Sequence, residues 1–421
     1  MKKIFDEIKK EPFKYIFFIV GFLFILIFFL ALLLTHGETL KNYIHAYPQD
    51  HFQDFFNSMN DTIGRHPYQN KVIYPPLCYV IYCIFLRFIP LNQLFNSNSM
   101  SLRLYQGPMF GFLIYFIITF LTFIYLMKKM KKGKELEKNL FLVLITFSLP
   151  FLFEFERANI IFISLLLLMF FFIFKDSKNK VLKELSLISL AASAAIKIYP
   201  AIFGLILLRE KKYKEIFRVI IYGLILFFVP FLLFGGFGEV IQFYKNLINT
   251  TNKFSEEVFM HRLNFTAYTD FLTRTFSLEN SIFPLIFKVL YIFVIFISCI
   301  NSLVTKCDWK RVLLLTLLMI ITPGISFTYT AIFLVIPIIM LLDDKNKKTK
   351  IDYVYLVLLI LVMFPNPVAI FERGDVGHFI KNLSWNSIIM STSIILMTFI
   401  LNIDIIISTI KQNKNKKLID K

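Results

Sequence analysis

Long apolar runs separated by short charged segments dominate this chain. The first run, residues 15–35 (YIFFIVGFLFILIFFLALLLT), contains no charged side chain. A helix of about 20 apolar residues spans the hydrocarbon core of a bilayer, so this run predicts a membrane-spanning helix. Runs of similar character recur along the sequence. The pattern therefore predicts an all-α, polytopic integral membrane protein.

Basic residues gather between the apolar runs. Seven short segments hold 32 of the 46 Lys and Arg residues: 1–14, 128–138, 175–183, 209–218, 306–311, 345–350 and 411–421. Cytoplasmic loops collect Lys and Arg, so we place all seven segments, and with them both termini, on the cytoplasmic side of the plasma membrane. Seven inside segments require about twelve crossings of about 20 residues each. We expect a single transmembrane domain over residues 1–421.

The first outside loop, residues 36–104, is predicted to be long and to contain interfacial helices. Residues 72–90 (VIYPPLCYVIYCIFLRFIP) are apolar enough for a crossing. A crossing there would move the basic 128–138 segment outside, and Pro75, Pro76 and Arg87 argue against a spanning helix. We interpret the segment as a helix lying in the outer leaflet.

Composition and missing motifs exclude several classes. The chain of 421 residues is 57% hydrophobic and carries a net charge of +18. Membrane topology explains that charge, so no nucleic-acid partner is expected. The four Cys show neither zinc-site nor disulfide spacing. The sequence has no Walker A loop, no GxGxxG after a strand, no HExxH and no nucleophile elbow. The composition therefore excludes a soluble enzyme, the missing motifs argue against an ATP-driven pump, and no cofactor or metal is predicted.

Acidic residues of the first outside loop are candidate general bases. Asp54 lies between aromatic residues, where partial desolvation raises a carboxyl pKa toward neutrality. The alternative is a solvated loop residue or a helix cap. Asp50 and Asp61 are equally acidic and equally near in sequence, so their chemistry does not choose between them.

Two further outside turns carry charge. The turn around Glu154 to Ala158 holds Glu154, Glu156 and Arg157 and is followed by Asn159, either as a functional cluster or as an interfacial cap. At the third turn, Lys197 precedes Tyr199 and Pro200 within an apolar stretch. An intramembrane Lys is expensive unless paired. It suits a lipid phosphate as a partner, or alternatively snorkels to the headgroups.

The remaining candidates follow later in the chain. His261, Asn264 and Arg274 offer cations and amide donors for a phosphate or for sugar hydroxyls, although the pattern slightly favours a polar surface loop. Tyr329 ends a hydroxyl-rich helix break that begins at Pro323. Cavity lining and a simple turn both account for that break.

With these residues in view, the sequence resembles glycosyltransferase family 87, the domain of unknown function 2029 group. The resemblance rests on D-F-x₁₁-P-Y-x₅-Y-P-P-L from Asp54 to Leu77, R-A-N-I-I at Arg157–Ile161, and A-A-x-K-x-Y-P-A ending at Ala201. It covers roughly residues 15–345, and its order and spacing are more specific than any single element.

The resemblance implies a C-type glycosyltransferase fold and an inverting transfer on the outer face. The donor would be a polyprenyl-phosphate sugar, with mannose the default, and the acceptor a glycolipid or cell-envelope glycan. Asp54 would be the general base. Lys197, with Arg157 or Arg274, would bind the donor phosphate. The lipid phosphate would act as the leaving group of the transfer, and no metal would be required. Substrate contacts are expected from Glu154, Glu156, Asn159, Tyr74, Tyr199, His261, Asn264 and Tyr329.

Two other functions remain open. One is a transporter or flippase of a lipid-linked saccharide, and the other is a polymerase or ligase of surface glycans. A transporter places its polar groups near the bilayer midplane. In this sequence they gather at the outside turns, which favours the glycosyltransferase.

Overall fold

The computed structural model describes residues 11–44, 51–90, 98–256, 261–371 and 384–419. Over these residues the fold is all-helical, with one isolated antiparallel bridge between Arg262 and Phe327. The chain divides into two compact units, each built from separate stretches of sequence. Unit 1 comprises residues 1–44, 131–152 and 257–421, and unit 2 comprises residues 45–130 and 153–256. The single domain over residues 1–421 stays a prediction.

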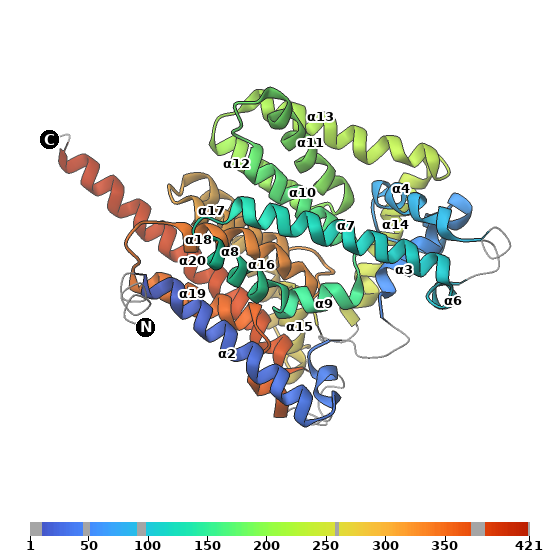
Figure 1. Ribbon diagram of the computed structural model, residues 1–421. Helices are drawn as coiled ribbons and strands as arrows, with labels where there is room; N and C mark the ends of the chain where they lie inside the picture. Colours follow the sequence, from blue (N-terminus) through green and yellow to red (C-terminus); the bar gives the residue numbers. More distant parts are fainter. Residues whose placement is uncertain (1–10, 45–50, 91–97, 257–260, 372–383, 420–421) are drawn as a thin grey trace. The chain divides into compact units, whose positions relative to one another are not determined.

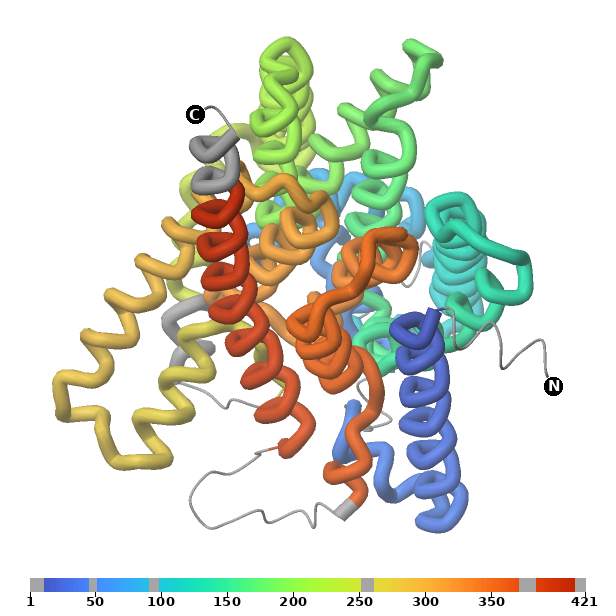
Figure 2. The backbone as a smooth tube through the Cα atoms, turned by 90° about the vertical axis from the view of Figure 1, so that its left-hand side faces the viewer, coloured from blue at the N-terminus to red at the C-terminus, as the bar shows by residue number. Residues whose placement is uncertain are grey.

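Unit 1 is a bundle of long apolar helices with short 3₁₀ segments. Its elements are α2 (Pro12–Leu34), η1 (Glu38–Asn42), α8 (Glu135–Thr146), the start of α9 (Leu149–Arg157), α15 (Phe265–Thr275), α16 (Phe283–Val304), α17 (Asp308–Ile321), η7 (Thr328–Leu334), α18 (Val335–Asp343), α19 (Lys350–Met363), η8 (Pro367–Phe371) and α20 (Trp385–Ile419). Figure 2 shows α20, α19 and α2 next to one another in this order, in red, orange and blue.

Polar side chains join the helices of unit 1 at a few buried points. The Asn301 amide donates to Asn402 Oδ1 at 2.8 Å, and the Asn402 amide donates to Ser298 Oγ at 2.7 Å. Lys310 Nζ on α17 lies 2.7 Å from Asp404 on α20. In lipid the hydrophobic effect does not drive helix association, so small residues and hydrogen bonds of this kind hold such helices together.

Unit 2 carries most of the predicted first outside loop. Its elements are α3 (Gln53–Thr62), η2 (Ile63–Arg65), η3 (Pro67–Asn70), α4 (Pro76–Phe85), η4 (Leu86–Phe88), α6 (Ser99–Leu102), α7 (Gln106–Met130), the end of α9, α10 (Ile161–Phe174), α11 (Lys180–Ile196), η5 (Tyr199–Phe203), α12 (Gly204–Arg209), α13 (Tyr213–Phe228), η6 (Val229–Leu233) and α14 (Gly238–Glu256). Helices α10, α11 and α13 pack side by side (Figure 1).

An aromatic cluster fixes α3 in unit 2. Phe55 is fully buried, and its ring centroid lies 5.0 Å from that of Tyr115, 5.2 Å from Phe112 and 5.4 Å from Tyr82. Fully burying one side chain of this kind contributes roughly 1.5–3 kcal/mol. The apolar side of α3 is therefore anchored on α4 and α7, which turns its polar side in another direction.

Helix length supports a membrane protein. Among the described residues, six helices are long and apolar enough to cross a bilayer, and up to seven if the bent pair α8 and α9 forms one span. Four shorter apolar helices have 10–17 residues. The twelve crossings, the inside positions of the termini and the interfacial position of residues 72–90 stay predictions. That segment is helical only from Pro76, because Pro75 and Pro76 allow a helix to begin but not to pass through them.

Candidate active site

The chain brings Asp54 and Arg157 together across 103 residues of sequence. Arg157 Nη2 lies 2.5 Å from Asp54 Oδ1, and both side chains are largely buried. Asn159 Nδ2 donates to the other carboxylate oxygen, Asp54 Oδ2, at 2.6 Å. Hydrogen bonds to a charged group are among the stronger ones in proteins. Both oxygens of the Asp54 carboxylate are thus held in a fixed orientation.

Local backbone features explain this meeting. The Phe52 N–H, at the start of α3, donates to the Glu156 carbonyl at 2.7 Å, so the first turn of α3 is tied to the last turn of α9. Ala158 has a φ of 51°, a left-handed conformation that ends α9 directly after Arg157. Asn159 Oδ1 then accepts from the Ile161 N–H at 3.0 Å and starts α10. Asp54 also lies in the first turn of α3, where the helix dipole favours a negative charge.

Tyr74 connects this pair to Lys197. Asn159 Nδ2 donates to the Tyr74 hydroxyl at 2.8 Å, and Lys197 Nζ lies over the Tyr74 ring, 3.8 Å from its centroid. Burial, together with the Asp54 charge, raises the pKa of Tyr74 well above its ordinary value, so its hydroxyl stays protonated. Tyr74 therefore contributes a donor near the carboxylate and an aromatic face to the ammonium.

Lys197 is a buried cation at a helix end. It follows α11, which ends at Ile196, and it precedes η5, whose N-terminal region carries Pro200. Burial lowers the pKa of Lys197 to about 8, although the neighbouring Cys78, Asp54 and Glu154 act in the opposite direction. Ser193 on α11 bonds Ser164 on α10 through their hydroxyls at 2.8 Å, which fixes the helix that presents Lys197.

Glu154 and Glu156 are more buried than a loop would allow. The predicted turn at Glu154 to Ala158 is instead the last part of α9, with the turn itself at Ala158. Glu154 is 1% exposed and Glu156 7% exposed. One Glu156 oxygen lies 3.8 Å from His51 Nδ1. Glu154 interacts electrostatically with Asp54, Lys197 and Arg157.

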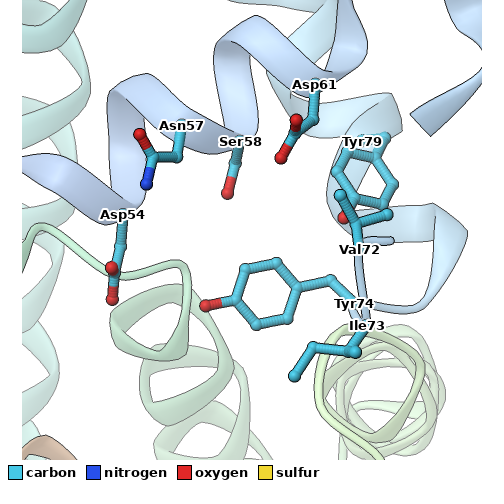
Figure 3. A pocket seen from close by; sticks show the side chains of 8 residues that line it. All are labelled: Asp54, Asn57, Ser58, Asp61, Val72, Ile73, Tyr74 and Tyr79. Atoms are coloured by element: carbon cyan, nitrogen blue, oxygen red, sulfur yellow. The ribbon is translucent and has the colours of Figure 1, made fainter. Parts of the chain in front are cut away.

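A small pocket opens along the polar side of α3. It has a volume of about 170 Å³ and is lined by Asp54, Asn57, Ser58, Asp61, Val72, Ile73, Tyr74 and Tyr79. Figure 3 shows Asp54 and Asp61 at different ends of it, with the Tyr74 hydroxyl pointing toward Asp54. Asn57, Ser58 and Tyr79 were not predicted from the sequence. The spacing of Asp54, Asn57, Ser58 and Asp61 is the signal that places them on one helix face.

An apolar groove of about 840 Å³ is also present in unit 2. It runs between α11, η5, α12, α13 and α14, and its lining contains no charged side chain. Ala194, Ala195 and Ile198, which flank Lys197 in sequence, belong to that lining. Unit 2 therefore contains both a cation close to a carboxylate and a large apolar groove.

The remaining predicted residues are Tyr199, which belongs to unit 2, and four residues of unit 1. Tyr199 begins η5 and is half-buried. His261, Asn264 and Tyr329 belong to unit 1, where the Leu263 N–H donates to the Ser326 carbonyl at 2.8 Å and the Thr328 N–H to the His261 carbonyl at 2.8 Å.

Within unit 1, Asn264 and Arg274 have different surroundings. The Asn264 amide donates to Thr266 Oγ1 at 2.7 Å and to the Gly324 carbonyl at 3.2 Å, so it holds its own loop. Arg274, an exposed residue, lies in the last turn of α15, at the far end of that helix from Asn264. Asp50 lies outside the described residues.

Unit 2 of this helical membrane protein holds a largely buried carboxylate, two cations and an apolar groove. Comparison with known proteins names the family. The model of glycosyltransferase family 87 matches residues 72–337, so the chain belongs to glycosyltransferase family 87. No curated protein and no solved structure matches it. Asp54 precedes the matched region, whereas its partners Arg157 and Asn159 lie within it.

Proposed function

We propose that this glycosyltransferase moves a hexose, with mannose the default, from a polyprenyl-phosphate donor to a glycolipid or cell-envelope glycan. The reaction takes place on the outer face of the plasma membrane. The contact of Asp54 with Arg157 and Asn159, next to Lys197, carries this proposal. It supplies a base and a phosphate-binding cation within one small cluster.

The proposed step is a single displacement. Asp54 takes the proton from the acceptor hydroxyl as that oxygen attacks the anomeric carbon. The bond from the anomeric carbon to the phosphate oxygen breaks, and polyprenyl phosphate leaves with the electron pair, which inverts the anomeric centre. Lys197 stabilises the negative charge that develops on the phosphate. A general base of this kind contributes about 10²–10⁴-fold to the rate.

The structure leads us to divide the two cations between these tasks. Arg157 contacts Asp54 directly, so we assign it to orienting the base. Lys197 is then the main group for the donor phosphate. The apolar groove suits the polyprenyl chain, because its lining has no charge and includes Ile198, the residue after Lys197. The alternative role of Arg157 in binding phosphate becomes secondary.

A transfer assay on the purified protein in lipid nanodiscs tests the proposal. The assay supplies polyprenyl phosphates carrying mannose, glucose or galactose, with a native lipid extract as acceptor. Asp54→Asn is compared with Glu38→Gln, which alters an exposed carboxylate of the same predicted loop. We expect release of polyprenyl phosphate and a new glycosylated product from wild type and Glu38→Gln, and loss of both from Asp54→Asn. Movement of donor across the bilayer without product would instead indicate a transporter.

A further inference from the structure

The pocket along α3 contains a carboxylate that the proposed reaction does not use. Asp61 lies at the other end of the pocket from Asp54, two helical turns along α3 (Figure 3). Asn57 and Ser58 lie between them on the same helix face, and Tyr74 and Tyr79 line the pocket beside them. Polar groups at both ends and aromatic side chains along the wall suit a small polar ligand with an apolar face.

The spacing of the two carboxylates suits one sugar ring. Seven residues of α-helix rise about 10.5 Å, so the Cα atoms of Asp54 and Asp61 are separated by about that length along the axis. Both carboxylates line the pocket, so a ligand that contacts both must extend over about two helical turns. The volume of about 170 Å³ corresponds to five or six water-sized groups, at roughly 30 Å³ for each water. One monosaccharide fits, and a longer glycan must continue outside.

The charge of the pocket selects against other ligands. An anionic phosphate is repelled by two carboxylates. A single metal ion binds its oxygen ligands at about 2.0–2.6 Å and does not reach carboxylates two turns apart. A neutral molecule with several hydroxyl groups satisfies both ends, because each carboxylate accepts hydrogen bonds from two neighbouring donors.

Asp61 is desolvated but not neutralised. Its carboxylate accepts a hydrogen bond from Asn70 Nδ2 at 3.5 Å, and no basic side chain forms an ion pair with it among the residues that the structure describes. Burial raises the pKa of Asp61 to about 6. The hydroxyl groups of a ligand would stabilise this buried carboxylate by donating hydrogen bonds to it. Hydrogen bonds to an ionised acceptor are roughly twice as strong as those between neutral groups.

The pocket belongs to the acceptor side of the reaction. Lys197, assigned to the donor phosphate, does not line the pocket, although Tyr74 both lines it and lies under the Lys197 ammonium. We propose, on the basis of the proposed function, that the terminal sugar of the acceptor binds in this pocket. Its nucleophilic hydroxyl then lies at Asp54, and two adjacent hydroxyls at its far end bind Asp61, which selects the sugar.

Binding of simple sugars tests this without knowledge of the natural acceptor. Methyl glycosides of mannose, glucose and galactose, with their monodeoxy derivatives, are titrated into the nanodisc protein and followed by saturation-transfer NMR. Wild type, Asp61→Asn and the matched control Asn60→Ala, on the same helix outside the pocket lining, are compared. We expect one hexoside to bind wild type and Asn60→Ala alike and to bind Asp61→Asn at least tenfold more weakly. Loss of one far hydroxyl should weaken binding to wild type only, because a site built for a hydroxyl discriminates strongly against its absence.

The same variants in the transfer assay separate the two proposals. With the native extract as acceptor, Asp61→Asn should raise the acceptor concentration at half-maximal rate at least tenfold and leave that of the donor unchanged. A shift for the donor instead, a fall in kcat equal to that of Asp54→Asn, or hexoside binding that is absent or independent of Asp61 would overturn the pocket assignment. Asp61-dependent hexoside binding without any transfer would refute the proposed function and leave the sugar site standing.

Discussion

The ion pair between Asp54 and Arg157 allows stability and catalysis to be separated by a double-mutant cycle. The perturbations are Asp54→Asn, Arg157→Met and the two combined. The side chains of Arg157 and Asp54 are 15% and 13% exposed, so each single change leaves a largely buried partner without its counterpart. Breaking a buried pair in this way costs about 3–5 kcal/mol of unfolding free energy. We expect about 3 kcal/mol here, because some exposure remains and Asn still accepts one hydrogen bond.

The two readouts should then diverge. Removing both charges takes away the uncompensated ion, so the double variant should be less destabilised than the sum of the single variants by about 2 kcal/mol or more. Its transfer rate should not recover, because the base is still absent, and a loss of about 10²–10⁴-fold is expected in both variants that lack Asp54. Stability is measured by denaturant unfolding in detergent, and transfer by release of polyprenyl phosphate.

The exposed pair of Lys41 and Glu38 provides the control. Their side chains are 60% and 77% exposed at a separation of 3.3 Å, so the same cycle should give a coupling of about 0.5 kcal/mol or less. Additive losses for Asp54→Asn and Arg157→Met would show that the pair contributes nothing as a pair. Transfer by Asp54→Asn within threefold of wild type would show that Asp54 is not the base.

Three further predictions address neighbouring groups. Asn159→Ala removes the amide that donates to Asp54 at 2.6 Å, and the rate should fall about 10–100-fold, equivalent to the 1.5–3 kcal/mol of a charged hydrogen bond, in a steady-state transfer assay. The pKa of Asp61 is raised from 3.8 to about 6, so its ionisation destabilises the fold as pH rises from about 4 to 6. Asp61→Asn should therefore be more stable than wild type at pH 7 by up to about 3 kcal/mol and equal to it at pH 4. A constant difference in unfolding free energy across a series of pH values would contradict this. Lys197→Met should raise KM for the polyprenyl-phosphate donor at least tenfold while the exposed Lys41→Met does not, and an unchanged donor KM would remove Lys197 from the phosphate site.

Much of the fold follows from local pattern. The apolar run at residues 15–35 forms most of α2. A bilayer provides no water for backbone N–H and C=O groups, and a helix pairs all of them within one segment. Pro75 and Pro76 set the start of α4, and Pro200 coincides with the break after α11, since proline acts on its immediate neighbours. The family resemblance also came from short local motifs, and the family model confirms it over residues 72–337.

The tertiary structure decided which acidic residue meets which cation. Asp54 and Asp61 have the same chemistry and lie seven residues apart, so residue type does not distinguish them, and only the family resemblance singled out Asp54. The aromatic anchoring of α3 and the tie from Phe52 to Glu156 place Asp54, and not Asp61, against Arg157. Asp61 lies on the same helix face, at the other end of a pocket that no sequence motif predicted.

Burial was the second feature that the sequence did not specify. The sequence predicts a charged turn at Glu154 and Glu156, but both residues are helical and buried. Helix α9 continues to Arg157, and the chain turns only at Ala158. Sequence alone determined which segments are apolar enough to form helices and which residue types carry chemistry. The environment of Asp54 depends on Arg157 and Asn159, about a hundred residues away, and only the packing of the helices brings them together.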